Sequence, residues 1–239
     1  MARNVVVTGG GTGIGYEIAR RFAEAGEQVV IVGRRRAVLE QAAAALGPGV
    51  TPLVCDLADP DAVEHALTGL PAEIDVLVNN AGSRETVPGA GPHALVARWR
   101  GDFERNVLTV VLLTESVRDR LTQGSGRVVT VSSIAALRGA GSYGAAKASL
   151  HAWNHFLAAQ LGPSGITANI VAPGTVAGTE FFGPRLDEAE IARRAARTLL
   201  GRIGETGEVA AAVQFLASAE AGFITGEILH LNGGELLGR

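Results

Sequence analysis

The chain has 239 residues, of which 47% are hydrophobic and 19% are charged, and its formal net charge at pH 7 is −3. This composition excludes a disordered chain, and the small negative charge argues against a nucleic-acid-binding surface. A single cysteine excludes an internal disulfide framework, and we expect neither a signal peptide nor a membrane-spanning segment. We therefore predict a cytoplasmic protein with no membrane or nucleic-acid partner.

Short β-branched runs alternate with stretches rich in Ala, Glu, Arg and Leu. The runs predict strands at residues 4–8, 28–32, 50–55, 75–79, 127–132, 167–171 and 227–231. The stretches predict helices at residues 14–25, 37–46, 61–67, 95–121, 143–161, 187–199 and 207–217. This alternation is typical of an α/β protein with a doubly wound, Rossmann-type parallel sheet of about seven strands and helices on both faces. No linker divides residues 1–239, so we predict a single dinucleotide-binding and catalytic domain.

A glycine-rich turn follows the first predicted strand and leads directly into the first predicted helix. Glycines there allow a tight turn and a close backbone approach to a pyrophosphate, which then lies against the N–H groups at the positive end of the helix. The turn therefore predicts dinucleotide binding. Its predicted contacts are Thr8, Gly9, Gly13, Ile14 and Gly15.

The end of the second predicted strand indicates which dinucleotide is bound. NAD-binding folds usually carry an acid about 20 residues after the glycine turn, where it holds the ribose 2′-hydroxyl. Here the strand ends in Gly33, and Arg34, Arg35 and Arg36 follow. With no carboxylate to repel it, a 2′-phosphate can pair with Arg34, so we predict NADP(H) in preference to NAD(H). Arg36 is expected in the solvated first turn of the next helix, and Arg35 fits either place.

Two further strand ends are predicted to contact the cofactor. Asp56 follows the third strand, where its carboxylate can reach an adenine amino group or cap the next turn, and Leu57 lies beside it. Asn79 ends the fourth strand and is expected to brace neighbouring strands. The small residues that follow would let the cofactor pass over the sheet edge; they are Asn80, Ala81 and Gly82.

Among the 21 basic side chains, Lys147 is the only lysine, and it lies four residues after Tyr143. At that spacing both side chains project from one helix face. An ammonium about 4–5 Å away stabilises a phenolate by roughly 3–4 kcal/mol, or about two to three pKa units, at an effective dielectric constant near 20. This predicts that the Tyr143 phenol can exchange a proton with a secondary alcohol.

Three polar residues are candidates to assist this proton transfer. Ser132 and Ser133 end the fifth predicted strand, and one of their hydroxyls can hold the substrate oxygen. Asn106 lies within the predicted helix at residues 95–121. Its amide either faces solvent or holds a water that links Lys147 to bulk solvent.

These motifs, in this order, resemble the short-chain dehydrogenase/reductase family. The pattern is similar to its single-domain branch and closest to the 3-oxoacyl-acyl-carrier-protein reductases. The resemblance extends over essentially the whole chain, because it also includes Pro173-Gly174 with Thr179 and the tail from Gly201 to Asn232-Gly233-Gly234.

The resemblance implies a role for each candidate residue. Tyr143 would be the general acid/base, and Lys147 would tune it and bind the nicotinamide ribose. Ser133 would orient the carbonyl, and Asn106 would sustain the proton relay. The residues implied along the nicotinamide carboxamide are Pro173, Gly174, Val176 and Thr179.

The chain departs from the family pattern in two places. The connection from Ser133 to Tyr143 is shorter than is common, which reshapes the substrate pocket or changes which serine points inward. Relatives that act on acyl chains carried by an acidic protein often have basic residues where this chain has Gln123, Gly124 and Ser164. A carrier-protein-bound substrate is therefore possible but unsupported.

We predict an NADPH-dependent reductase that converts a small-molecule ketone or 3-oxoacyl group to a secondary alcohol. The alternatives are an NAD-dependent secondary alcohol dehydrogenase and a non-catalytic NADP(H)-binding regulator. The resemblance also implies a homo-tetramer, built in part from the helices at residues 95–121 and 143–161. Residues 179–199 are expected to form a mobile lid, in which Phe181 and Phe182 favour an apolar substrate. No metal is expected, because no pair of His, Cys or carboxylate residues has metal-ligand spacing.

Overall fold

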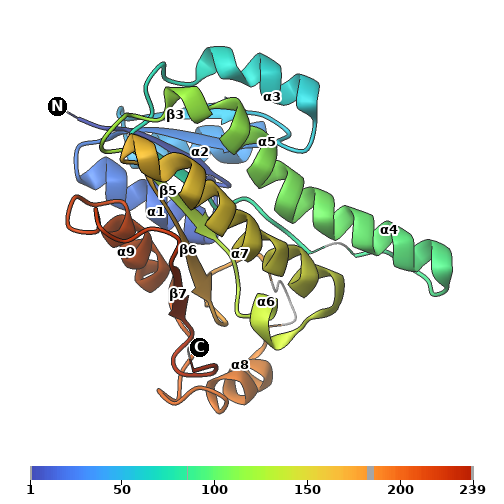
Figure 1. Cartoon of the computed structure of the whole chain (residues 1–239). Helices are drawn as coiled ribbons and strands as arrows, with labels where there is room; N and C mark the ends of the chain where they lie inside the picture. The colour runs from blue at the N-terminus through green and yellow to red at the C-terminus, as the bar shows by residue number, and fades with distance from the viewer. Residues whose placement is uncertain (1, 85, 182–185, 238–239) are drawn as a thin grey trace.

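The computed structural model describes residues 2–84, 86–181 and 186–237. Within them, one sheet of parallel strands has the order β3-β2-β1-β4-β5-β6-β7 (Figure 1). The strands are β1 Asn4–Thr8, β2 Gln28–Gly33, β3 Val50–Val54, β4 Val76–Asn79, β5 Arg127–Val131, β6 Thr167–Pro173 and β7 Ile228–Leu231. The predicted fold class is therefore confirmed.

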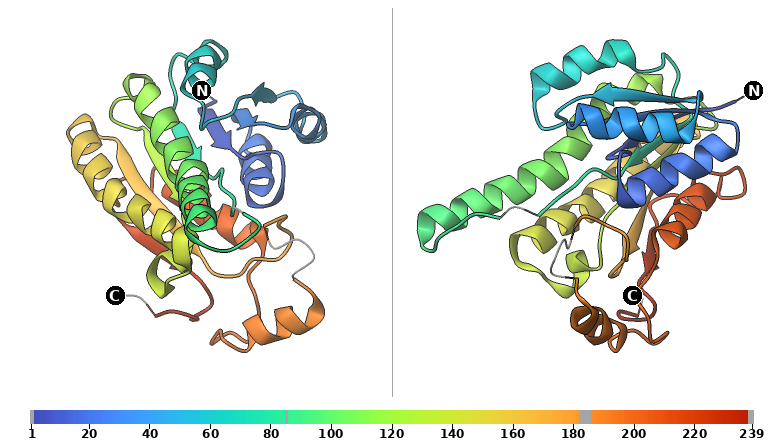
Figure 2. Two further views of the ribbon diagram at one scale, coloured as in Figure 1. Left: turned by 90° about the vertical axis from the view of Figure 1, so that its right-hand side faces the viewer. Right: turned by 180° about the vertical axis from the view of Figure 1, so that it is seen from behind.

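Helices cover both faces of the sheet (Figures 1 and 2). They are α1 Gly13–Glu24, α2 Arg36–Leu46, α3 Pro60–Ala66, α4 Pro92–Phe103, α5 Thr109–Ser116, α6 Ala135–Arg138, α7 Gly141–Leu161, α8 Glu188–Ala195 and α9 Thr206–Leu216. Side chains of α1, α2 and α9 belong to one buried cluster, and those of α3, α5 and α7 to another. No helix of the described residues is long and apolar enough to cross a membrane.

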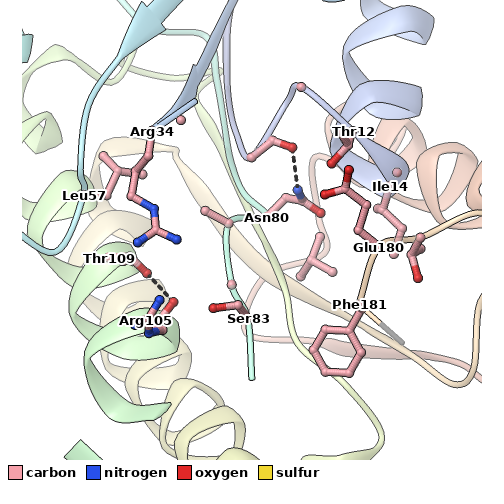
Figure 3. Close-up of a pocket in the computed structure, with 18 of the residues that line it drawn as sticks. Thr12, Ile14, Arg34, Leu57, Asn80, Ser83, Arg105, Thr109, Glu180 and Phe181 are labelled. Atoms are coloured by element: carbon pink, nitrogen blue, oxygen red, sulfur yellow. Dashed lines mark hydrogen bonds between the residues drawn. The ribbon is translucent and has the colours of Figure 1, made fainter. Parts of the chain in front are cut away.

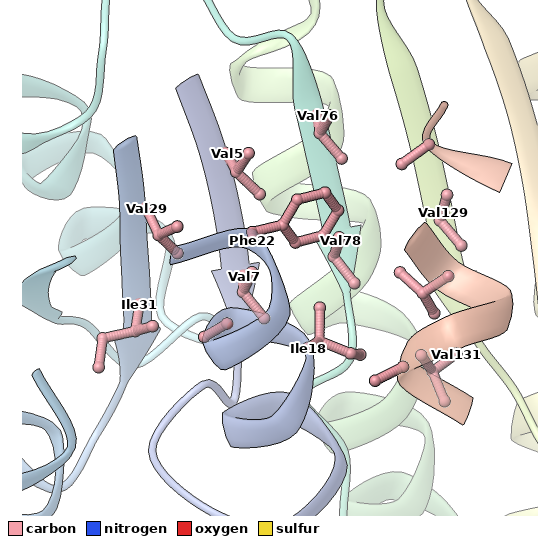
Figure 4. Packing of buried hydrophobic residues seen from close by; sticks show 14 of the residues in the cluster. Val5, Val7, Ile18, Phe22, Val29, Ile31, Val76, Val78, Val129 and Val131 are labelled. Atoms are coloured by element: carbon pink, nitrogen blue, oxygen red, sulfur yellow. The ribbon is translucent and has the colours of Figure 1, made fainter. Parts of the chain in front are cut away.

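The alternation of side chains along β1 shows why both faces are apolar. Val5 and Val7 point to one face, where they belong to the same buried cluster as Phe22 of α1 (Figure 4). Val6 points to the opposite face and belongs to the cluster that contains Leu157 of α7. Because β1 is covered on both sides, its residues from Val5 to Val7 form a continuous apolar run, as strands in parallel sheets usually do.

The strand order changes direction between β1 and β4, which are neighbours in the sheet. Strands that diverge in this way leave a crevice at their carboxyl ends, and open α/β sheets bind ligands at such a switch point. The glycine-rich turn follows β1, and the segment from Asn80 to Gly82 follows β4. Two motifs that lie about 70 residues apart in the chain are thus brought to the same edge of the sheet.

The single long helix predicted at residues 95–121 is largely confirmed, because helical backbone runs without a gap from Pro92 to Ser116, but it is not one uniform α-helix. It consists of α4, a π-helical turn at Glu104–Leu108 and α5, and a short 3₁₀ turn follows at Arg118–Arg120. α4 projects from the body of the protein (Figures 1 and 2). Large apolar side chains on it are exposed, namely Leu95, Val96, Trp99 and Phe103.

Candidate active site

The glycine-rich turn packs directly against the chain that leaves β4. Gly9 and Gly13 have φ angles of +66° and +55°, which favour glycine. A Cβ atom on Gly15 would overlap the Gly9 carbonyl oxygen and lie 2.5 Å from Asn80 Nδ2. Asn80 Nδ2 in turn donates a hydrogen bond to the carbonyl oxygen of Thr8 over 3.0 Å. Close packing against Gly9 and Asn80 therefore requires glycine at position 15.

Thr8 holds this edge of the sheet together through its buried hydroxyl. The Thr8 Oγ1 atom accepts hydrogen bonds from the backbone N–H groups of Asn80 and Ala81, each over 2.9 Å. Asn79 has the bracing role predicted for it, because its Nδ2 atom donates to Thr114 Oγ1 over 2.9 Å and to Thr130 Oγ1 over 3.5 Å. These contacts fix the ends of β1, β4 and β5 relative to one another.

A cavity of about 770 Å³ begins at this edge and runs to α7. Arg34 and Leu57 lie on one side of it, and Glu180 and Phe181 lie on the other (Figure 3). Most of the residues predicted to bind a cofactor or substrate line its wall. They are Gly9, Gly13, Ile14, Arg34, Asp56, Leu57, Asn80, Ala81, Gly82, Ser133, Tyr143, Lys147, Pro173, Gly174, Val176 and Thr179. Thr8, Gly15 and Asn106 are not among the lining residues.

Of the two readings of Asp56, the turn cap corresponds to an observed contact. Asp56 Oδ1 accepts a hydrogen bond from the backbone N–H of Ala58 over 3.2 Å, so the carboxylate caps the turn after β3. Its Oδ2 atom lies 3.9 Å from Arg34 Nη1, at the rim of the cavity. Arg36 pairs with Glu40 in the exposed first turn of α2, as expected.

Arg35 has a contact that the sequence did not indicate. Its Nη2 atom lies 2.8 Å from Glu180 Oε2, so the pair joins the loop after β2 to the segment after β6. Thr179 and Phe181 flank Glu180, and Phe182 lies outside the described residues. The Phe181 ring centre is 5.2 Å from that of Tyr143, so Phe181 forms an apolar wall beside the phenol.

The structure distinguishes the two serines after β5. Ser132 is buried, and its Oγ atom lies 2.8 Å from Nε2 of the buried His151. The Ser133 hydroxyl instead acts on the Tyr143 phenol, whose pKa it lowers, and its Oγ accepts a hydrogen bond from the backbone N–H of Ala135 over 3.1 Å. The shorter connection between β5 and α7 therefore still brings Ser133 to Tyr143.

Tyr143 and Lys147 lie one turn apart on α7, and their side chains are almost fully buried. Burial raises the pKa of Tyr143 to about 12, although the Ser133 hydroxyl and the charge of Arg84 act to lower it. Burial also lowers the pKa of Lys147 to about 8, and Lys147 Nζ donates to the carbonyl oxygen of Val131 over 3.1 Å. The expectation that Lys147 brings the phenol pKa down is thus wrong for this structure, because desolvation raises that pKa by more than the Ser133 hydroxyl and the charge of Arg84 lower it.

Asn106 lies in the π-helical turn and faces the site, not solvent. Its Nδ2 atom donates to the carbonyl oxygens of Ser83, over 2.7 Å, and Asp102, over 2.8 Å. Its Oδ1 atom is buried and accepts no hydrogen bond from the described residues. A Cβ atom on Gly82 would lie 2.7 Å from Asn106 Oδ1 and 3.2 Å from Lys147 Nζ, so the two polar atoms converge on that glycine.

A buried carboxylate that the sequence analysis missed lies beside this group. Asp102 is 1% exposed and accepts a hydrogen bond from Ser142 Oγ over 2.6 Å. Because Ser142 immediately precedes Tyr143, this bond ties α4 to the start of α7. The charge of Asp102 contributes to raising the pKa of Tyr143.

Over nearly its whole length, the chain is similar in sequence to known proteins. A family model described as enoyl-(acyl carrier protein) reductase matches residues 9–235. The 3-oxoacyl-[acyl-carrier-protein] reductase FabG of Escherichia coli is 35% identical over 236 residues, which cover 96% of this chain and 95% of that protein. The chain belongs to the short-chain dehydrogenase/reductase family.

Other members of the family differ in their named substrates. Galactitol 2-dehydrogenase (L-tagatose-forming) of Cereibacter sphaeroides is 34% identical, and the match covers 95% of this chain and 92% of that protein. The crystal structure of a short-chain dehydrogenase/reductase from Brucella melitensis, of the glucose/ribitol dehydrogenase type, has a TM-score of 0.88 at 30% identity. It covers 99% of this chain and 97% of that one. As a short-chain dehydrogenase/reductase, this protein is an oxidoreductase.

Several lining residues of this short-chain dehydrogenase/reductase were not predicted from its sequence. Thr12 belongs to the glycine-rich turn, so a signal for it was present. Arg105 directly precedes Asn106, and Thr109 lies about one turn after it. Thr109 Oγ1 donates a hydrogen bond to the Arg105 carbonyl oxygen over 3.0 Å (Figure 3). Ser83 and Arg84 follow Gly82 in an irregular segment. Nothing in the local pattern marks these last four positions.

Proposed function

We propose that this protein is an NADP(H)-dependent reductase that converts a ketone or 3-oxoacyl group to a secondary alcohol. The observation that carries the proposal is the meeting of Ser133, Tyr143 and Lys147 at one end of a cavity whose other end is bordered by the glycine-rich turn and Arg34. The resemblance to 3-oxoacyl-[acyl-carrier-protein] reductase FabG supports this direction of reaction. The whole chain would act as one dinucleotide-binding and catalytic domain.

The residues along the cavity fit NADP(H). Gly9 and Gly13 line the cavity without a side chain, as a pyrophosphate that approaches the backbone requires. Arg34 would pair with the 2′-phosphate, while Asp56 and Leu57 would border the adenine. Beyond Asn80, Ala81 and Gly82, the nicotinamide end would lie against Lys147 and a second group of residues. That group is Pro173, Gly174, Val176 and Thr179.

When bound, the reduced nicotinamide supplies a hydride to the carbonyl carbon. The protein's own part is to hold the carbonyl oxygen and to give it a proton. Ser133 would donate a hydrogen bond to that oxygen, and Tyr143 would donate the proton. With its pKa raised to about 12, the phenol is protonated at neutral pH, which is the state that a general acid needs.

Lys147 and Asn106 would return a proton to Tyr143 after each turnover. Buried polar groups seldom go without a partner, and Asn106 Oδ1 has none among the described residues. A water held between this oxygen and Lys147 Nζ, beside the open edge of Gly82, would satisfy both atoms. Such a water would connect the Tyr143 site to solvent.

The walls of the site favour a substrate with an apolar part. Phe181 lies against Tyr143, where it would cover the substrate and exclude water. An NAD-dependent secondary alcohol dehydrogenase is the second candidate, and the similarity to galactitol 2-dehydrogenase favours it. A comparison of turnover with NADPH and NADH decides between the two.

We also propose that the protein assembles as a homo-tetramer. The exposed apolar side chains of α4 would be buried in such an assembly, as would Phe156 on α7. Sedimentation equilibrium of the purified protein tests this. A monomer at micromolar concentration would contradict it.

The activity is tested by measuring NADPH oxidation with a panel of ketones and 3-oxoacyl thioesters. Wild type is compared with Tyr143→Phe, which removes the proton donor and keeps the ring that Phe181 contacts. We expect turnover with wild type and its loss, by at least about a hundredfold, in the variant. NADPH binding should persist in both. Equal turnover in the two proteins would show that Tyr143 is not the acid.

A further inference from the structure

A buried carboxylate outside the proposed catalytic group lies in the tail that follows β7. The Glu235 side chain is 4% exposed, and its Oε1 atom meets two guanidinium groups. Arg197 Nη2 lies 2.6 Å from this oxygen, and Arg138 Nη1 contacts the same oxygen. One carboxylate thus pairs with two cations that come from distant parts of the chain.

The two cations belong to segments beside the substrate end of the cavity. Arg138 is the last residue of α6, which lies in the short connection between Ser133 and Tyr143. Arg197 follows α8. A tight packing contact transmits the position of α6 to α7, because a Cβ atom on Gly144 would lie 2.6 Å from the Ala135 carbonyl oxygen. A shift of α6 would therefore reach the turn that carries Tyr143.

The tail that carries Glu235 is itself fixed by hydrogen bonds. Asn232 Oδ1 accepts from the backbone N–H of Gly234, and Asn232 Nδ2 donates to the Leu236 carbonyl oxygen, each over 3.0 Å. The backbone N–H of Leu200 donates to the Gly233 carbonyl oxygen over 3.2 Å. These hydrogen bonds fix the backbone of the tail, so the Glu235 side chain can hold other segments in place.

We propose that Glu235 is a positioning residue for the reductase: through Arg138 and Arg197 it holds α6 and the segment after α8 in the arrangement that binds the carbonyl substrate. Without its charge, two guanidinium groups would face each other with no anion between them, and the segments would separate. This inference rests on the proposed reductase activity. Because Glu235 is not among the residues that line the cavity, its loss should weaken substrate binding while cofactor affinity is kept.

The test is the variant Glu235→Gln, which keeps the shape and removes the charge. With the best ketone of the panel, we expect KM to rise about tenfold while kcat and the NADPH Kd change by less than about twofold. Amide hydrogen exchange should become faster at residues 135–138 and 191–200. The matched control is Glu27→Gln, which also removes a carboxylate paired with an arginine, Arg3 at 2.8 Å, but at the opposite end of the sheet. Its KM should equal that of wild type.

Arg197→Gln and Arg138→Gln remove the more exposed arginine partners of the same contacts. They replace Glu235→Gln as the test if that variant does not fold. Each should raise KM, and the double variant E235Q/R197Q should be no worse than E235Q, because both changes remove one interaction. Wild-type KM and wild-type exchange in these variants would overturn the proposal. If wild type reduces no carbonyl, the reductase proposal fails, whereas the exchange comparison still decides whether Glu235 holds the two segments.

Discussion

Arg34→Ala is expected to remove most of the preference for NADPH while leaving the fold intact. The Arg34 and Asp56 side chains are 56% and 47% exposed and their charged atoms are 3.9 Å apart, so this ion pair contributes less than about 1 kcal/mol to folding. A charge-assisted hydrogen bond to a phosphate contributes about 1.5–3 kcal/mol. That corresponds to a rise in the NADPH Kd of roughly 10- to 150-fold. The upper half of this range is expected, because Asp56 would then face the phosphate without its cation.

The measurement is a fluorescence titration of wild type and variant with NADPH and with NADH. NADH affinity should change little, since its ribose carries no 2′-phosphate. Arg36→Ala is the matched control, because Arg36 pairs with Glu40 on the exposed side of α2. It should leave both affinities unchanged. A change of less than about threefold in the NADPH/NADH ratio for Arg34→Ala would refute the assignment of the phosphate to this side chain.

Three further outcomes are expected. Gly15→Ala places a methyl group 2.5 Å from the Asn80 amide nitrogen, so it should abolish cofactor binding and cost about 1–3 kcal/mol of stability. Cofactor titration and urea unfolding measure the two effects. The control is Gly162→Ala, whose methyl group would have nothing within 4 Å and should change neither. Asp102→Asn removes a charge that raises the pKa of Tyr143, so the alkaline limb of the pH–rate profile should move to lower pH; an unmoved limb would contradict this contribution. Burial lowers the pKa of His151 from 6.5 to about 4, so between these pH values the unfolded chain binds a proton that the folded protein does not. Stability should therefore fall by about 2–3 kcal/mol as the pH drops through this window, and urea unfolding of His151→Leu should show a smaller fall.

Local patterns were sufficient to predict the sheet and the glycine-rich turn. β-Branched runs mark strands that are buried on both faces, and glycines that need a positive φ mark the turn after β1. The Tyr143–Lys147 spacing likewise places two side chains on one face of a helix, whatever surrounds it. Each of these features depends on residues that are close together in the sequence.

Features that depend on distant residues were missed or left open. The helix that contains Asn106 includes a π-helical turn, where the Asn106 amide donates to the Ser83 carbonyl oxygen, 23 residues away. Which serine faces Tyr143 depends on His151, which lies 19 residues after Ser132 and holds its hydroxyl. No sequence pattern specifies either contact.

The direction of the Tyr143 pKa shift was missed for a related reason. Spacing along α7 gives the distance to the favourable charge, but desolvation depends on every element packed around the phenol. The contact of Glu235 with Arg138 and Arg197 has no sequence signature, since the three residues come from separate segments.

The single lysine has a practical consequence for labelling chemistry. Apart from the terminal amine, Lys147 carries the only primary amine of the chain, and it is 4% exposed. Because its pKa is lowered to about 8, about half of this amine is neutral and nucleophilic at that pH. Small amine-reactive reagents that enter the cavity would therefore modify one side chain, at the proposed catalytic centre, and their attachment would report whether that cavity is filled. Immobilisation through surface lysines, by contrast, has no side chain to act on.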